Sequence, residues 1–130
     1  MPLKEIGCLN FAMSFSTKYI FMFLIFDTET TGLPKKWKAP LSDFENWPRL
    51  VQLAWQCHDL EGNFLFAKNH VIIPDDYSIP KEAEDVHGIS TETAQDKGIS
   101  LKEALTNFVE DVKKAKLIIG HNVEFDINIV

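Results

Sequence analysis

Residues 19–33, YIFMFLIFDTETTGL, combine the longest apolar run of the chain with a pair of acidic residues. Eight apolar or aromatic residues lead directly into Asp27 and Glu29, and Thr-Thr-Gly then breaks the run. A run of this length that ends in a turn signal predicts a strand buried on both faces. Side chains alternate along a strand, so Asp27 and Glu29 point to the same face. Two such carboxylates repel each other, so a cation is expected between them. Oxygen-only ligands favour Mg²⁺ or Mn²⁺.

The composition is that of an ordinary globular domain. The chain has 130 residues, of which 45% are hydrophobic and 25% are charged, enough for one domain with a real core. Its net charge of -6 argues against a general nucleic-acid scaffold protein but does not exclude an enzyme that meets phosphates through metal ions. Two cysteines are too few for a disulfide framework, which predicts a cytoplasmic location. No span reaches the roughly 18 apolar residues of a membrane helix, so no membrane partner is expected.

The chain divides into a short N-terminal segment and one domain. We predict a tail at residues 1–18, where polar residues interrupt the apolar ones and no signal-peptide core follows. We predict a single folded domain at residues 19–130. Because its last apolar pattern, residues 123–130, stops without a helix cap or a polar tail, we expect this domain to be C-terminally incomplete.

Two further strands are predicted after a long loop. Residues 34–48 contain three prolines and no steady period, which is typical of a functional or mobile loop. From Arg49 to Cys57 apolar and polar residues alternate, and residues 64–73 form the next apolar run after a turn that contains Gly62. Such runs indicate an antiparallel hairpin. The more apolar face of its first strand is predicted to carry Val51, Leu53, Trp55 and Cys57.

The second half of the domain is predicted to be mainly helical. Pro80 and Gly88 bracket a helix at residues 81–87. Ser100 fits the N-cap of a longer amphipathic helix. The buried face of that helix is predicted to comprise Leu101, Ala104, Leu105, Phe108, Val109, Val112 and Ala115. A short buried strand at residues 117–120 and a final helix complete the prediction.

Three sequence motifs together resemble a known family. A D-x-E pair alone is a weak signal. The chain contains it as FDTETTGL at residues 26–33, and GHNVEFD follows at residues 120–126 with VHGIS at residues 86–90 between them. With these motifs, nearly all of residues 19–130 resembles the DEDD-type, DnaQ-like 3′-5′ exonucleases, which include the proofreading epsilon subunit of DNA polymerase III and ribonuclease T.

The resemblance implies a fold and an activity. The implied fold is α/β and ribonuclease-H-like, with a mixed central sheet of three antiparallel strands and then parallel strands, flanked by helices. The implied activity is hydrolysis of phosphodiester bonds at the 3′ end of single-stranded DNA or RNA, which releases nucleoside 5′-monophosphates. The implied cofactors are two divalent metal ions, Mg²⁺ or Mn²⁺. A DNA polymerase is the implied protein partner.

The resemblance also assigns roles to individual residues. Asp27 would bridge both ions, Glu29 would bind the ion that activates water, and Asp126 would hold the second ion. The residues implied to meet the substrate are Thr28, Thr30, Gly32 and Leu33 at the terminal nucleotide, Asn122 and Phe125 at the edge of the site, and His87 near the substrate groove. For His87, capping of the helix end is the alternative.

The family's third motif is not evident in the chain. That motif is a His or Tyr, with an Asp five residues later that is a further metal ligand. His121 and Asp126 have this separation, but their neighbours fit the second motif better. The general base must lie within hydrogen-bond reach of the attacking water, and no other histidine is an obvious substitute. We therefore expect the 130-residue chain alone to have little or no activity.

Two other functions remain open on the sequence. The first is a catalytically silent module that binds nucleic acid or a protein partner. It is suggested by the missing motif and by Lys35, Lys36 and Lys38 around Trp37, which either meet a phosphate backbone and a base or form a solvated basic turn. The second is a phosphatase or other phosphoryl-transfer enzyme, which is weakly supported because the chain shows no separate nucleophile motif.

Overall fold

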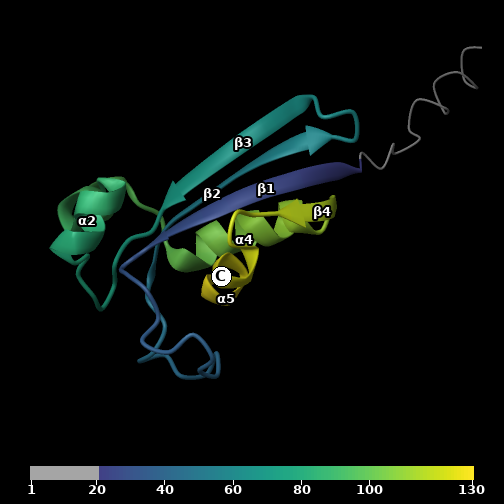
Figure 1. Cartoon of the computed structure of the whole chain (residues 1–130). Helices are drawn as coiled ribbons and strands as arrows, with labels where there is room; N and C mark the ends of the chain where they lie inside the picture. Colours follow the sequence, from purple (N-terminus) through teal and green to yellow (C-terminus); the bar gives the residue numbers. More distant parts are fainter. Residues whose placement is uncertain (1–20) are drawn as a thin grey trace, which may run out of the picture.

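A mixed four-stranded sheet forms the centre of the domain (Figure 1). The computed structural model describes residues 21–130, so the predicted tail at residues 1–18 lies outside the described residues. The strands are β1 (Met22–Thr30), β2 (Leu50–Asp59), β3 (Phe64–Val71) and β4 (Ala115–Ile119). The helices are α2 (Lys81–His87), α3 (Thr91–Lys97), α4 (Leu101–Val112) and α5 (Val123–Ile129).

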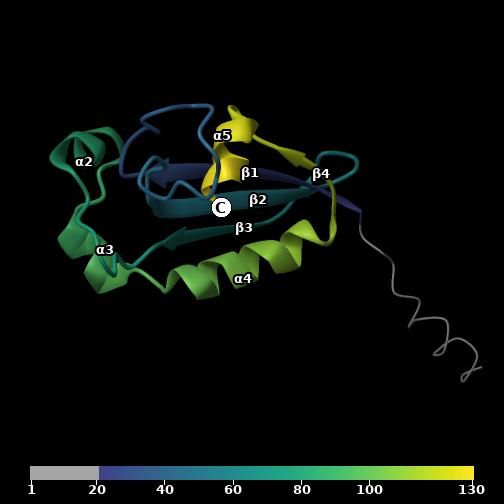
Figure 2. The ribbon, with the colours of Figure 1, turned by 90° about the horizontal axis from the view of Figure 1, so that it is seen from below.

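The strand order confirms the predicted α/β class. The sheet runs β3-β2-β1-β4, with β1 antiparallel to β2, β2 antiparallel to β3, and β4 parallel to β1. Helix α4 lies along one face of the sheet, α2 and α3 lie beyond one end, and α5 lies beside β1 (Figures 1 and 2). No helix in residues 21–130 is long and apolar enough to cross a membrane.

The main core lies between the sheet and α4. Phe108 of α4 packs against two sheet residues, with ring centroids 5.1 Å from Phe26 and 5.2 Å from Trp55. The predicted apolar face of β2 is confirmed, because Val51, Leu53, Trp55 and Cys57 are all buried. A smaller core joins Val51 to α2 and α3. Burial of the side chains of the main core, at roughly 1.5–3 kcal/mol each, is the main force that holds α4 on the sheet.

Two predicted strands are less buried than expected. In β1, Met22, Leu24, Phe26 and Thr28 are buried, but the opposite face is only partly covered. The prediction of a buried strand at residues 117–120 is wrong, since Leu117 is 52% exposed and Ile118 and Ile119 are also exposed. The reason is position, because among the described strands β4 has β1 as its single neighbour and forms an edge of the sheet.

The predicted caps set the limits of the helices. The Ser100 hydroxyl accepts a hydrogen bond from the Glu103 N–H at 3.2 Å, as expected of an N-cap. Gly88 ends α2 with a left-handed φ of 77°. Helix α4 ends at Val112 rather than near Ala115, and on its predicted buried face Leu101 and Val109 are exposed. The covered stripe of α4 is therefore narrower than its apolar pattern.

One acidic residue of α4 lies inside the core. Asp111 is 2% exposed and accepts hydrogen bonds from Trp55 Nε1 at 3.0 Å and from Lys68 Nζ at 2.7 Å. Burial raises the pKa of Asp111, but the hydrogen bonds from Lys68 and Trp55 and the charges of Lys68 and Lys114 outweigh burial, so its pKa lies below the ordinary value of 3.8. Asp111 therefore ties α4 to β2 and β3 as a charged group.

Candidate metal and nucleic-acid site

The two acidic residues of the first motif lie where β1 leaves the core. Asp27 pairs with Ala54 of β2 and is exposed, whereas Glu29 pairs with Gln52 and is half-buried. Thr28 between them points to the opposite face and is buried. The register shifts after Glu29, which marks a bulge at the end of the strand. As predicted, Asp27 and Glu29 therefore share one face of β1.

Asp126 is anchored at the open edge of β1. Strand β4 pairs with β1 only from Met22 to Ile25, so beyond Ile25 this edge of β1 has no neighbouring strand among the described residues. There the Asp126 Oδ1 accepts hydrogen bonds from the Thr28 N–H at 3.1 Å and from the Thr28 hydroxyl at 2.6 Å. Asp126 is 2% exposed. Its carboxylate thus takes the place of a strand partner and is fixed beside the D-x-E pair.

The electrostatics of Glu29 show that the three carboxylates affect one another. Burial raises the pKa of Glu29, the negative charges of Asp27 and Asp126 raise it further, and a positive charge on His87 would lower it. The repulsion comes from two different elements, β1 and α5, which meet at this end of the sheet. Protonation of a carboxylate or a bound cation would remove this repulsion.

The chemistry of these ligands suits a divalent cation, although they do not close around a single point. Within residues 21–130, no three His, Cys, Asp or Glu side chains converge closely enough to hold one ion. The Oδ1 of Asp126 is directed at Thr28. Three carboxylates at one strand end still match the oxygen-only ligands that Mg²⁺ and Mn²⁺ prefer. Water and phosphate oxygens would complete the coordination of such an ion.

Apart from His87, the residues predicted to contact the substrate lie in two segments. One is residues 28–33, at the end of β1 and the start of the following loop, and the other is residues 122–125, at the start of α5. Thr28 and Phe125 lie beside Asp27 and Asp126 in the chain, and Phe125 is half-buried. Gly32 and Leu33 begin the loop after β1, and the Leu33 side chain is 72% exposed. The Thr30 hydroxyl donates to the Gly32 carbonyl at 2.6 Å, and Asn122, which precedes α5, is exposed and makes no side-chain cap.

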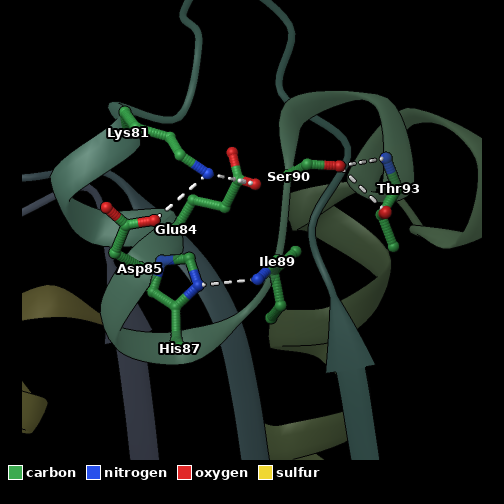
Figure 3. Close-up of polar contacts among 7 residues, drawn as sticks. All are labelled: Lys81, Glu84, Asp85, His87, Ile89, Ser90 and Thr93. Carbon is green, nitrogen blue, oxygen red and sulfur yellow. Dashed lines mark hydrogen bonds and ion pairs between the residues drawn. The ribbon is translucent and has the colours of Figure 1, made fainter.

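His87 is the last residue of α2. Its Nδ1 accepts a hydrogen bond from the Ile89 N–H at 3.1 Å, so it stabilises the turn after the helix (Figure 3). The Nε2 of His87 is buried and has no hydrogen-bond partner among the described residues. The structure thus supports the helix-end role of His87.

The structure reveals a second aromatic residue at the site. Trp37, in the loop after β1, packs against Phe125 with ring centroids 5.7 Å apart. Its loop is clamped by buried Asn46, which accepts from the Lys36 N–H at 2.7 Å and donates to the Lys36 carbonyl at 2.9 Å. The three prolines indicated a special loop, but nothing in the sequence singled out Asn46 or paired Trp37 with Phe125.

The anchor of Asp126 gives a direct test of stability. Thr28→Val keeps the shape and the backbone N–H of this residue but removes the hydroxyl donor, so we expect the free energy of unfolding to fall by about 1–2 kcal/mol. Chemical denaturation measures this change. Thr30→Val is the matched control, because the Thr30 hydroxyl is bonded at the surface, and it should stay within about 0.5 kcal/mol. Equal losses in both variants would contradict the anchor.

Comparison with known proteins agrees with this geometry. An exonuclease family model, RNase T, matches residues 24–130, which include Asp27, Glu29 and Asp126. The chain belongs to the RNase T exonuclease family. Similar members are DNA polymerase III epsilon subunits, with 34% identity over 105 residues in Rickettsia conorii and 28% over 107 residues in Buchnera aphidicola. These matches cover 80% and 82% of this chain and 40% and 42% of those relatives, so the chain spans about two fifths of their length.

Solved structures of exonucleases share this fold. Escherichia coli exonuclease I in complex with a dA13 oligonucleotide has a TM-score of 0.68 and 26% sequence identity. The match covers 84% of this chain and 22% of that one. Exonuclease I from Methylocaldum szegediense, at 24% identity and with the same TM-score and coverage, supports the fold alone. The family model therefore shows the RNase T exonuclease family, and the solved structures support the α/β fold.

Proposed function

We propose that the protein is a 3′-5′ exonuclease that hydrolyses the terminal phosphodiester bond of single-stranded DNA or RNA and releases nucleoside 5′-monophosphates. The observation that carries the proposal is the arrangement of Asp27 and Glu29 on one face of β1, with Asp126 fixed at the adjoining edge through Thr28. Family membership supports nuclease chemistry. Residues 19–130 are proposed to belong to the nuclease domain.

Each residue has a distinct task in this proposal. Asp27, Glu29 and Asp126 would hold two divalent ions, Mg²⁺ or Mn²⁺, which activate water and neutralise charge on the phosphoryl group. Thr28 keeps the Asp126 carboxylate in place. Burial of Glu29 and the negative charges of Asp27 and Asp126 raise its pKa, so a bound cation would relieve the repulsion among these carboxylates. Substrate contacts are proposed for Thr28, Thr30, Gly32, Leu33, His87, Asn122 and Phe125.

The test uses the full-length protein and a single-stranded oligonucleotide labelled at its 5′ end. With Mg²⁺ or Mn²⁺ we expect a ladder of products shortened one nucleotide at a time from the 3′ end, together with 5′-mononucleotides. Chelation by EDTA should stop the reaction. Absence of shortening under all these conditions would refute the enzyme. For residues 1–130 alone we expect little or no digestion, because too few ligands gather at one point in the described part of the chain.

A silent binding module is the second candidate. It is favoured by the lack of three converging metal ligands within residues 21–130 and by the basic loop around Trp37. Such a module would bind single strands with an affinity that falls as salt rises, yet would never shorten them. The same oligonucleotide assay separates the two functions, because only the enzyme yields mononucleotides.

We also propose a cellular setting from the relatives and the sequence. The matched proteins are subunits of DNA polymerase III, so a DNA polymerase is the proposed protein partner and the 3′ end of a single strand is the proposed substrate. The described cysteine, Cys57, is a free buried thiol in the core. A reducing cytoplasm is the setting in which such a thiol persists.

A further inference from the structure

We propose that Trp37 is a base-stacking platform for single-stranded nucleic acid and that Lys35, Lys36 and Lys38 bind the phosphates of the same strand. This inference rests on the proposed function and specifies how the strand is held outside the carboxylate site. The loop that carries these residues, residues 32–48, lies beside α5 in both views of the molecule (Figures 1 and 2).

The first argument is the position of Trp37. Its ring packs against Phe125 at a centroid distance of 5.7 Å and a plane angle of 55°, and Phe125 directly precedes Asp126 in the chain. The Trp37 side chain is 55% exposed, so part of the ring remains open to a ligand. An exposed aromatic ring supported by a second ring beside the acidic site is suited to stacking with a nucleobase.

The second argument is that the loop is held in shape before any ligand binds. At its neck, the Thr31 N–H donates to the Arg49 carbonyl at 3.0 Å and the Arg49 N–H donates to the Thr31 hydroxyl at 2.9 Å. Inside the loop, Asn46 holds both backbone groups of Lys36. A compact loop with joined ends loses little conformational entropy when it binds a strand.

The third argument is charge. Lys35, Lys36 and Lys38 are exposed, and within residues 21–130 none of their ammonium groups forms an ion pair. Asp27 and Glu29 at the adjoining strand end repel a phosphate chain, and the whole protein carries a net charge of -6. Unpaired cations on a loop next to this acidic end supply the local attraction that a polyanion needs.

The chain offers a matched control for the lysines. Lys113, Lys114 and Lys116 form a second group of three lysines, and Lys114 lies 3.5 Å from Asp111. These residues flank the start of β4, which pairs with β1 at Met22, the strand end opposite the acidic motif. At the rise per residue of a strand, that end lies roughly 20 Å from the acidic motif. The second group carries equal charge at a different place.

The stacking test measures binding of a 5′-fluorescein-labelled dT12 strand to the full-length protein by fluorescence anisotropy, with EDTA present to prevent cleavage. Trp37→Ala should weaken binding about 5- to 100-fold, the loss of one stacked base. Trp37→Tyr should stay within about threefold, because a stacking ring remains. Phe44→Ala is the control, since Phe44 is an 80% exposed aromatic of the same loop. Unchanged binding by Trp37→Ala, or an equal loss in Phe44→Ala, would overturn the platform.

The phosphate test measures the salt dependence of the same binding. Removing Lys35, Lys36 and Lys38 together, each replaced by Ala, should reduce the slope of log affinity against log salt by about 2, at about 0.7 per phosphate contact. The same change at Lys113, Lys114 and Lys116 should leave the slope unaltered, and an equal reduction there would refute the assignment. A protein that shortens DNA but binds independently of Trp37 refutes only the platform. Binding through Trp37 without shortening refutes only the nuclease.

Discussion

Asp27→Asn is expected to reduce nucleotide release by at least about 1,000-fold, which corresponds to about 4 kcal/mol of transition-state stabilisation. The substitution keeps the size of the side chain and removes the charge proposed to hold both ions. Asp27→Ala should act in the same way. The measurement is the rate of 3′ shortening of a 5′-labelled oligonucleotide in Mg²⁺ by the full-length protein.

The folded state should tolerate the loss of Asp27. Its side chain is exposed, and its charge raises the pKa of Glu29, so its removal relieves repulsion in the folded protein. We therefore expect a free energy of unfolding within about 0.5 kcal/mol of wild type, or slightly higher. Glu124→Gln, at an exposed position of α5, is the control that should retain activity. Activity of Asp27→Asn equal to that of this control would contradict the proposed role.

Asp111→Ala is expected to lower the free energy of unfolding by about 2–4 kcal/mol. The variant leaves the buried Trp55 N–H without its acceptor and Lys68 without its counter-ion. The Lys68 side chain is 37% exposed and can regain water, so the loss stays below that of a fully buried pair. Glu110→Ala, at the exposed neighbouring position, should change stability by less than about 0.5 kcal/mol. Urea denaturation of both variants checks the difference.

The same residue should make the stability of the protein sensitive to acid. The folded-state pKa of Asp111 lies below its ordinary value of 3.8. Its stabilising contribution is therefore complete above the unfolded pKa and is lost as pH falls through the folded pKa. Wild type should lose this stability below about pH 4. Asp111→Asn has no charge to lose, so its deficit relative to wild type should shrink as pH falls from 6 to 3. A constant deficit would show that Asp111 does not titrate in this way.

The sequence predicted local features of the fold well, because they depend on neighbouring residues. Alternation along residues 50–57 identified the buried face of β2, and Ser100 and Gly88 identified helix ends. The D-x-E spacing placed Asp27 and Glu29 on one face. Apolar composition alone could not reveal that β4 has a single neighbouring strand, so the prediction of a buried strand there was wrong.

Features that join distant parts of the chain escaped prediction. The bond between Thr28 and Asp126 connects residues 98 positions apart, and local patterns carry no information about such a pair. Asp111 looks like an ordinary polar position of an amphipathic helix, although it is buried against Trp55. The resemblance to the exonucleases identified Asp126 as a ligand, but the structure was needed to show what holds it.

The short pairing between β4 and β1 has a dynamic consequence. Strand β4 pairs with β1 only over Met22–Ile25, and Asp126 is the single buried residue of α5. Segments with so few buried contacts open at lower free energy than the protein as a whole. In native-state hydrogen exchange, amides of β4 and α5 should therefore exchange before those of β2. Each such opening would carry Asp126 away from Thr28, so we expect this anchor to be lost on heating before the sheet itself melts.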